Sequence, residues 1–191
     1  MKWASEQPYG QIKRLSAEAG YYGGRINQWK LTESMGGGAI YDMGVYPING
    51  LRYATGLEPL AVNEARHVTT RPKIFTEVDE TTYFTLEFPG NITAQGATSF
   101  GHNWNKMHVD CDNGWYELSP FQSYSGIQGT TSDGQVLNKS IPNQQAKQMD
   151  DDALSIINDS KVIVPGAEGM KDIRIVEAIK KSAKSGQRVN I

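Results

Sequence analysis

Gly36 to Pro59 reads GGGAIYDMGVYPINGLRYATGLEP, and the rest of the chain is organised around this stretch. Three glycines lead into a segment with the apolar spacing of a helix, and Gly56 closes it. Pro47 has no N–H to donate to the carbonyl of Met43, so we expect the helix to kink or restart there, next to Gly44. The apolar positions can pack this helix into a core: Ile40, Met43, Val45, Ile48 and Leu51.

Three polar residues of this helix lie four and three positions apart, which predicts that they share one face. They are Asp42, Tyr46 and Asn49. A carboxylate, a phenol and an amide on one stripe can move protons and hold hydroxyl groups. The same spacing is also typical of an ordinary buried helix with a polar edge, and periodicity alone leaves both interpretations open.

The composition excludes several classes of protein. A length of 191 residues fits one sizeable domain with a real core. A net charge of −2 without long charged runs argues against a nucleic-acid or anionic-membrane surface. One cysteine, Cys111, excludes an internal disulfide and fits a reducing compartment. No signal peptide or membrane span is visible, so we expect a cytoplasmic protein, unless a targeting signal was lost with an upstream segment.

We expect residues 1–10 to be a polar junction without a folded element. After it, alternating hydrophobicity predicts a series of strands. Because strand follows strand without intervening helices, we expect an antiparallel meander within an α+β domain over residues 11–191. The expected strands are Gln11–Ala19, Leu60–His67, Thr81–Phe88, Ile92–Phe100, Lys106–Asp112 and Trp115–Leu118.

The last third of the chain predicts two helices. Ser119–Asn143 reads as loops with a short strand around Gln135–Leu137, and Val189–Ile191 as a short final strand. Gly186 caps the second helix. The first helix, Gln144–Asn158, has an apolar face of Met149, Ala153, Ile156 and Ile157; the second, Glu168–Ser185, has a core stripe of Met170, Ile173, Val176, Ile179 and Ala183.

The central stretch resembles a known family. The run GGGAIYDMGVYPIN, followed by Arg52-Tyr53 and by GLEP, is similar to the central segment of the glucose–fructose oxidoreductase / inositol dehydrogenase (Gfo/Idh/MocA) family. Asn27–Leu31, Glu77–Glu80 and Pro165–Met170 resemble the family too, so the likeness covers nearly the whole chain from about Gly10 onward. It is strongest to glucose–fructose oxidoreductase-like members, which carry Tyr, here Tyr46, where inositol dehydrogenases carry His.

The resemblance implies an architecture and a reaction. It implies a large, predominantly antiparallel sheet with helices on one face, whose open face packs on the same face of a second subunit. We therefore expect a homodimer or a tetramer through the sheet face. The resemblance also implies hydride transfer between a nicotinamide cofactor and the hydroxyl of a sugar, polyol or cyclic diol. In that reaction Tyr46 would transfer the proton, Asp42 would orient it or the substrate, and Asn49 would contact a substrate hydroxyl.

The chain also departs from the family pattern. Members begin with a dinucleotide-binding domain that carries a G-x-G-x-x-G turn and ends in a Glu-Lys-Pro segment with a catalytic Lys, and this sequence has neither. The chain therefore resembles the second domain alone. We expect this fragment to bind no NAD or NADP and to be inactive by itself. Gly36 to Gly38 permit close approach of another segment or a ligand, so Gly37 and Gly38 are weak candidates for cofactor contact.

A second group of candidates lies before the central helix. Arg25, Gln28 and Trp29, close to Tyr21 and Tyr22, are suited to a sugar pocket, because ring faces stack on C–H surfaces while Arg and Gln hold hydroxyls. The aromatic residues are equally suited to pinning the loop to the domain.

The remaining polar residues predict structural roles. Arg52 is expected to pair with Glu58. His108 and Cys111 fall on opposite faces of a strand, which argues against a metal site, while His67 and His102 lack partners at ligand spacing.

Two functions remain open on the sequence: the substrate-binding and oligomerisation domain of an NAD(P)-dependent oxidoreductase, or a non-catalytic binding or assembly module that retains the fold. An unrelated α+β domain is a remote third. The sequence does not identify the substrate, the choice between NAD and NADP, or the direction of reaction.

Overall fold

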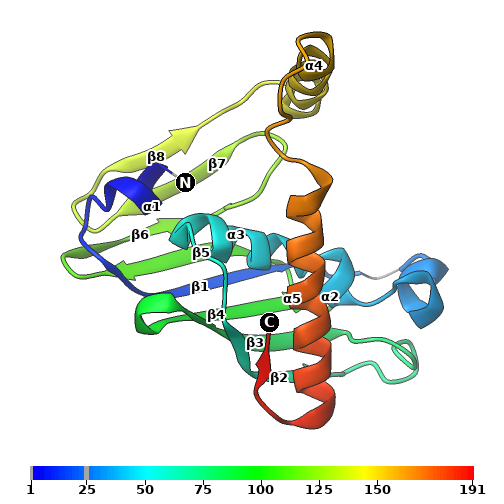
Figure 1. The fold of residues 1–191 in the computed structure, drawn as a ribbon. Helices are drawn as coiled ribbons and strands as arrows, with labels where there is room; N and C mark the ends of the chain where they lie inside the picture. Colours follow the sequence, from blue (N-terminus) through cyan, green and yellow to red (C-terminus); the bar gives the residue numbers. More distant parts are fainter. Residues whose placement is uncertain (1, 24–25) are drawn as a thin grey trace.

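The computed structural model describes residues 2–23 and 26–191. One large sheet carries helices on a single face, as Figure 1 shows. The described residues form a nine-stranded sheet in the order β8-β7-β6-β5-β1-β4-β3-β2-β9. Its strands are β1 (Ile12–Gly20), β2 (Ala61–Val68), β3 (Thr81–Phe88), β4 (Ile92–Ser99), β5 (Trp104–Cys111), β6 (Gly114–Leu118), β7 (Ile127–Thr131), β8 (Val136–Lys139) and β9 (Val189–Asn190).

The first strand corrects the predicted meander. β1 lies between β4 and β5, parallel to the former and antiparallel to the latter, with Leu15 opposite both Ala94 and Val109. The sheet is predominantly antiparallel, as predicted, but it is not one continuous meander. Local alternation shows that β1 is a strand and cannot show where it inserts, because strand order depends on contacts between distant segments.

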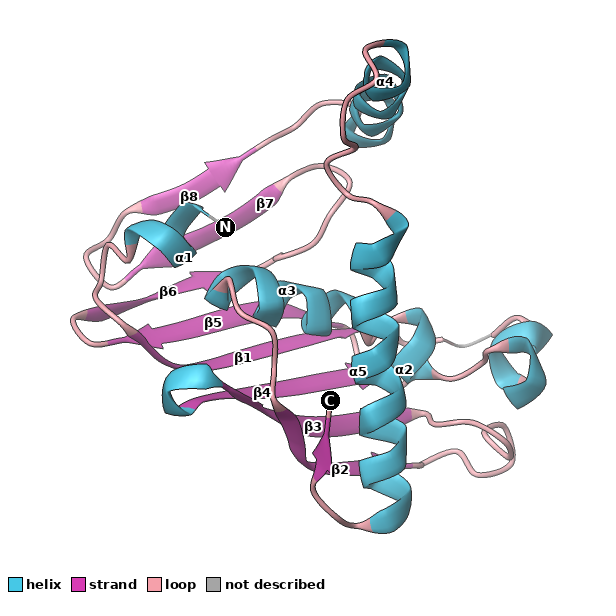
Figure 2. Ribbon diagram, viewed as in Figure 1, coloured by secondary structure: helices cyan, strands magenta, loops and turns pink. Residues whose placement is uncertain are grey.

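Helices cover the front of the sheet (Figure 2). Ile40 and Ile48 from the central stretch meet Ile175 and Ile179 from the C-terminal helix in one buried cluster over the sheet. The helices are α1 (Lys2–Glu6), α2 (Ala39–Asp42), α3 (Val45–Thr55), α4 (Gln144–Ile157) and α5 (Gly166–Ser185), with 3-10 turns at Gln28–Leu31, Glu33–Met35 and Pro89–Asn91.

The central helix is broken, as its sequence predicts. α2 ends at Asp42 and α3 begins at Val45, so the restart comes at Gly44, slightly before Pro47. A Cβ at Gly44 would lie only 2.4 Å from the carbonyl oxygen of Ile40, which is why a residue without a side chain stands there. Gly56 ends α3 in the left-handed conformation, with φ of 67°.

The N-terminal residues differ from the expected junction. They form α1, whose Trp3 packs edge-on against Tyr116 at 5.0 Å and against Tyr9 at 6.0 Å between ring centroids. The prediction from polar composition overlooked Trp3, whose large aromatic side chain packs this segment against the core. The division of the chain at residue 10 stays a prediction.

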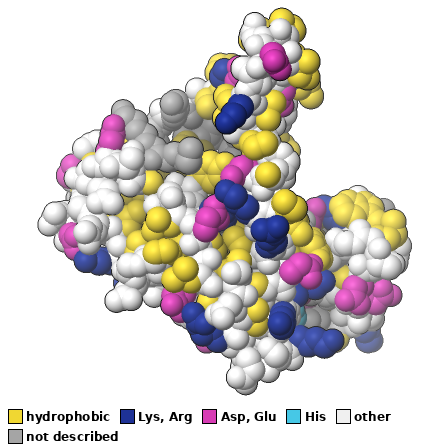
Figure 3. All heavy atoms as spheres, viewed as in Figure 1, with side chains coloured by type: hydrophobic (Ala, Val, Ile, Leu, Met, Phe, Trp, Pro, Cys, Tyr) yellow, Lys and Arg dark blue, Asp and Glu magenta, His cyan; other side chains and the backbone are white. Residues whose placement is uncertain are grey.

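The two C-terminal helices lie where the sequence places them, but their buried faces differ. Met149, Ile156 and Ile157 on α4 are exposed, so the predicted apolar face lies outside the core that the described residues form. Figure 3 shows hydrophobic side chains gathered on this projecting helix. On α5, Met170 and Ile173 are exposed. The buried stripe of α5 is rotated to Asp172, Ile175, Val176, Ala178, Ile179 and Ser182. It includes two polar residues, which a count of apolar spacing leaves out.

The region between β6 and α4 holds one strand more than predicted. β8 lies close to the expected Gln135–Leu137 strand, whereas β7 falls where loops were expected. The sequence of β7, IQGTT, lacks the apolar alternation that marks a strand, and its position is set by pairing with β6 and β8.

The face of the sheet opposite the helices is uncovered. It forms a shallow hollow of about 710 Å³ whose lining includes Glu18, Arg66, Tyr83, Gln95 and Lys106. A homodimer through this face stays a prediction. Within the described part of the chain, no helix has the length and apolar character needed to cross a membrane.

Candidate active site

Two of the predicted site residues, Tyr46 and Asn49, lie one turn apart on α3 and line one hollow. It has a volume of about 360 Å³ and is completed by Phe121, Gln122 and Asp172. The Tyr46 side chain is 40% exposed, and its hydroxyl forms no hydrogen bond with any described residue. It is therefore free to bond a ligand.

Asn49 is held in one orientation by Asp172 on α5. Its Nδ2 donates to Oδ2 of Asp172 at 3.1 Å. A carboxylate accepts hydrogen bonds, so the amide N–H₂ must face Asp172. The Oδ1 atom of Asn49 bonds to none of the described residues, which leaves an acceptor for a hydroxyl group.

Arg52 fixes Asp172 in turn. The buried guanidinium donates from Nη1 to Asp172 at 2.6 Å and reaches Glu168 at 2.9 Å. It also grips both carboxylate oxygens of Glu58, at 2.7 and 2.8 Å, which confirms the predicted pair. The hydrogen bonds to Glu58, and then those to Asp172 and Glu168, raise the pKa of Arg52 further despite its burial. This cluster joins α3 to the start of α5 and so fixes one wall of the hollow.

Asp42 belongs to a different group of side chains. It precedes the helix break, and its Oδ2 accepts from Nζ of Lys30 at 2.6 Å and from the Tyr21 hydroxyl at 3.4 Å. The single stripe predicted for Asp42, Tyr46 and Asn49 is thus wrong in its continuity, because α2 and α3 are separate helices. Asp42 does not line the hollow that holds Tyr46.

Lys30 is a residue that the sequence reasoning did not single out. Its ammonium also donates to the Tyr21 hydroxyl at 3.1 Å and lies 5.3 Å from the ring centroids of both Tyr21 and Trp29. Burial by itself would lower the pKa of Lys30, but the bonds to Asp42 and Tyr21 outweigh it and the pKa is raised. The only sequence feature that pointed to Lys30 was its position inside the segment Asn27–Leu31, which resembles the family.

Comparison with known proteins assigns this chain to a family. The sequence model described as the GFO/IDH/MocA C-terminal domain matches residues 2–117. The chain belongs to the Gfo/Idh/MocA family. It is similar to the aldose-aldose oxidoreductase of Caulobacter crescentus, solved in complex with glycerol, at 32% identity and a TM-score of 0.90, with 100% of this chain and 58% of that one covered.

Two further oxidoreductases are similar to this chain in fold or in sequence. The myo-inositol 2-dehydrogenase of Lactobacillus plantarum shares the fold with a TM-score of 0.78 at 20% identity, over 100% of this chain and 60% of that one. The D-xylose 1-dehydrogenase [NADP(+)] of Haloarcula marismortui is 26% identical over 179 residues, which is 86% of this chain and 47% of the relative. The chain thus spans about half to three-fifths of the length of these oxidoreductases.

The two described members of the predicted second group of site residues, Gln28 and Trp29, lie outside the Tyr46 hollow. Gln28 is exposed, and Trp29 is 43% exposed beside Lys30. Neither of them lines the hollow. Arg25 falls outside the described residues. A substrate-binding role for these three stays a prediction.

The glycines considered for cofactor contact are packed against the chain itself. A Cβ at Gly38, whose φ is 109°, would lie 2.2 Å from Oδ1 of Asp79, and one at Gly37 would lie 2.6 Å from the carbonyl oxygen of Lys30. The expected close approach is present, and other segments of the chain make it. Asp79 also accepts from the N–H of Ile40 at the start of α2, at 2.9 Å.

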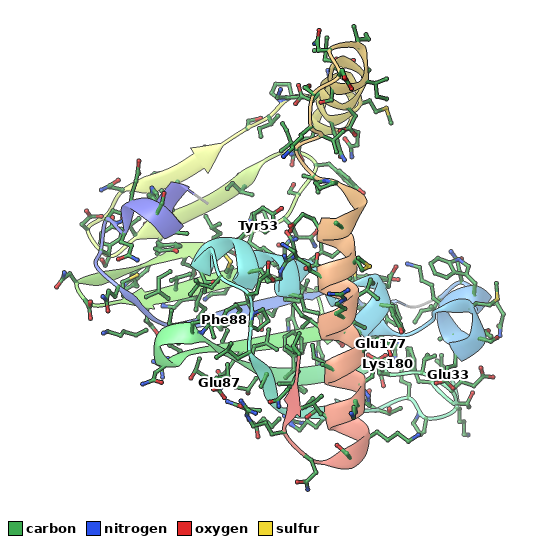
Figure 4. The ribbon with its side chains drawn as sticks, in the orientation of Figure 1. Glu33, Tyr53, Glu87, Phe88, Glu177 and Lys180 are labelled. Carbon is green, nitrogen blue, oxygen red and sulfur yellow. The ribbon has the colours of Figure 1, made fainter. Side chains whose placement is uncertain are left out.

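Tyr41 and His108 form contacts with neighbouring side chains that have a structural role. Figure 4 shows Glu177 and Lys180 on α5 near α2, where the Tyr41 hydroxyl donates to Glu177 and the Lys180 ammonium lies 4.7 Å from the Tyr41 ring centroid. Burial, and then Glu177, raise the pKa of Tyr41 to about 12. His108 bonds Glu117 at 3.0 Å and Asp110 at 3.1 Å. No cluster of three or more His, Cys, Asp or Glu suited to a metal occurs in the described ranges.

Proposed function

We propose that this chain forms the alcohol-binding wall of an NAD(P)-dependent oxidoreductase acting on a sugar, polyol or cyclic diol. The observation that carries the proposal is the hollow between α3 and α5, where the unbonded Tyr46 hydroxyl and the Oδ1 atom of Asn49 are both available. Family membership and the sugar and inositol oxidoreductases among the relatives support the same class of reaction.

Oxidation of an alcohol releases a hydride and a proton, and a group in hydrogen-bond reach of the oxygen must take the proton. Tyr46 is assigned that role: its hydroxyl accepts the substrate proton as it passes its own to water. Because a phenol alone is a poor base, a neighbouring cation would help it, and this follows the family pattern rather than a contact in this chain. Asn49 would accept a hydrogen bond from a second hydroxyl of the substrate and so orient it.

Asp42 has a modified role in this proposal. Its carboxylate is engaged by the Lys30 ammonium at 2.6 Å and does not line the Tyr46 hollow, so it acts as an electrostatic neighbour and not as the proton acceptor. The predicted direct partnership of Asp42 with Tyr46 is not part of the proposal.

The chain by itself is proposed not to hold a dinucleotide. In support, its sequence has no G-x-G-x-x-G turn, and the carbonyl oxygen of Lys30 and the Asp79 carboxylate fill the space that a Cβ at Gly37 or Gly38 would take. We therefore assign the nicotinamide, which supplies the hydride acceptor when bound, to a separate dinucleotide-binding domain. Titration of NADH and NADPH into this chain is expected to show no binding, and micromolar affinity would contradict the division of the site.

The catalytic role is tested in a polypeptide that joins this chain to a dinucleotide-binding domain. Tyr46→Phe is expected to lower kcat on an accepted sugar or polyol by about 10²-fold with little change in KM. The matched control is Tyr53→Phe on the same helix, labelled in Figure 4, which lies outside the hollow. Normal turnover by Tyr46→Phe would show that Tyr46 only lines the hollow and transfers no proton. Absence of turnover in the parent protein would favour a non-catalytic binding or assembly module.

A further inference from the structure

A second hollow, of about 750 Å³, continues from the Tyr46 hollow along the loop before β7. Tyr46, Phe121 and Gln122 line both hollows, so the two form one continuous depression. Its far end is formed by Tyr124 and by Gln144 at the start of α4. We call this depression, from Asn49 to Tyr124, the long groove.

The shared wall of the long groove is held rigidly by one side chain. The Oδ1 atom of Asn105 on β5 accepts from the N–H groups of Phe121 and Gln122 at 3.0 and 3.2 Å, and its Nδ2 donates to the carbonyl oxygen of Gln122 at 2.8 Å. A loop tied by three bonds to a central strand presents its side chains at fixed positions. Binding then loses less conformational entropy.

The far end combines an aromatic ring with free amide groups. The Tyr124 side chain is 79% exposed although it lines a hollow. Gln144 donates from Nε2 to the carbonyl oxygen of Ser123 at 2.9 Å, which closes this end and leaves its Oε1 as an acceptor. The side-chain amide of Gln122 forms no hydrogen bond with the described residues. A ring that stacks on C–H faces, beside amides that bond hydroxyls, suits a carbohydrate.

We infer that the long groove holds a second sugar ring, joined glycosidically to the ring whose alcohol lies at Tyr46 and Asn49. This inference rests on the proposed function. The Tyr46 hollow alone has about 360 Å³, and the continuation adds a space about twice as large beyond the reacting position. Sites of 300–1,000 Å³ bury ligands larger than one small ring. The chain thereby favours a disaccharide or longer glycan over a monosaccharide or an inositol.

The test compares glucose with two disaccharides that differ in linkage, cellobiose and maltose, by NMR titration of this chain. At least one disaccharide is expected to bind about tenfold more tightly than glucose. Tyr124→Ala should bring that disaccharide to within about twofold of glucose and leave glucose binding unchanged. Leu60→Ala is the control, because Leu60 is also an exposed large side chain but lies outside the groove.

Asn49→Ala tests the proposed function separately from the second-ring inference. It should weaken the binding of glucose and of both disaccharides, because all three place an alcohol at Asn49. If glucose binds and depends on Asn49 while neither disaccharide binds more tightly, the second-ring inference is overturned and the proposed function stands. If a disaccharide binds more tightly but Tyr124→Ala does not weaken it, the long groove is likewise excluded. If no sugar binds, both proposals fall.

Discussion

The carboxylate of Asp172 accepts hydrogen bonds from Asn49 at 3.1 Å and from Arg52 at 2.6 Å, so one buried side chain joins the candidate site to the ion cluster between α3 and α5. The distance along the chain is 123 residues from Asn49 to Asp172. The orientation of the substrate-facing amide thus depends on the position of a distant helix. Stability and site geometry are coupled at this point.

Asp172→Asn should therefore destabilise the fold. The amide cannot accept from both partners as the carboxylate does, and Arg52 loses one of its buried counter-charges. We expect the free energy of unfolding to fall by about 1–3 kcal/mol, measured by urea denaturation. Glu58→Gln is the matched control, because Glu58 binds the same guanidinium with a side chain that is 52% exposed, and should cost less than about 1 kcal/mol. An equal or larger loss for Glu58→Gln would contradict this account.

Lys30→Met should destabilise the loop before the central helix. The substitution leaves the Asp42 carboxylate, only 20% exposed, with a single long contact to Tyr21. An unsatisfied, largely buried acceptor costs about 1–3 kcal/mol, again read from urea denaturation. Lys147→Met removes an exposed pair with Asp151 on α4 and should change stability by less than about 0.5 kcal/mol. Equal effects of the two substitutions would show that the Lys30 pair contributes no more than a surface pair.

Glu80→Gln should destabilise the protein in a pH-dependent way. Glu80 is 1% exposed and accepts from the backbone N–H groups of Thr70 and Arg71 and from Nε of Arg71 at 2.7 Å. Burial by itself would raise the pKa of Glu80, but these bonds outweigh it and the pKa is lowered. At pH 7 the loss of the charged partner is expected to cost about 3 kcal/mol.

The sign of the pH dependence follows from the lowered pKa. The contribution of Glu80 is fully present above its unfolded value, near 4.5, and is lost as the pH falls through the folded pKa. The difference between the parent chain and Glu80→Gln should thus shrink as the pH falls below 4.5. Glu87→Gln, at an exposed pair with Arg188, serves as the control and should change stability little at either pH. A loss for Glu80→Gln that is constant with pH would rule out the charge as its cause.

The rotated stripe of α5 predicts unequal effects of two similar substitutions. Ile175 is 1% exposed, and Ile175→Ala should cost about 2–5 kcal/mol by thermal or urea unfolding. Ile173 is 42% exposed, and Ile173→Ala should stay within about 0.5 kcal/mol. The stripe predicted from apolar spacing alone would give the opposite order, so the pair decides between the two faces.

The sequence by itself determined the local elements and the family. The spacing of apolar residues located most strands, the broken central helix and the two C-terminal helices, because side-chain periodicity follows directly from backbone geometry. The central motif indicated the Gfo/Idh/MocA family. It also identified Tyr46 and Asn49 as candidate site residues on one helix face. Arg52 and Glu58 were paired correctly because they lie only six residues apart.

Only the tertiary structure decided which distant residues meet. In the folded chain β1 lies between β4 and β5. Asp42 forms an ion pair with Lys30, and Asp172 contacts Asn49 and Arg52. The tertiary structure also joined the loop at Phe121 to the Tyr46 hollow. Such contacts depend on how whole elements pack, and polar partners on different elements leave no periodic trace in the sequence.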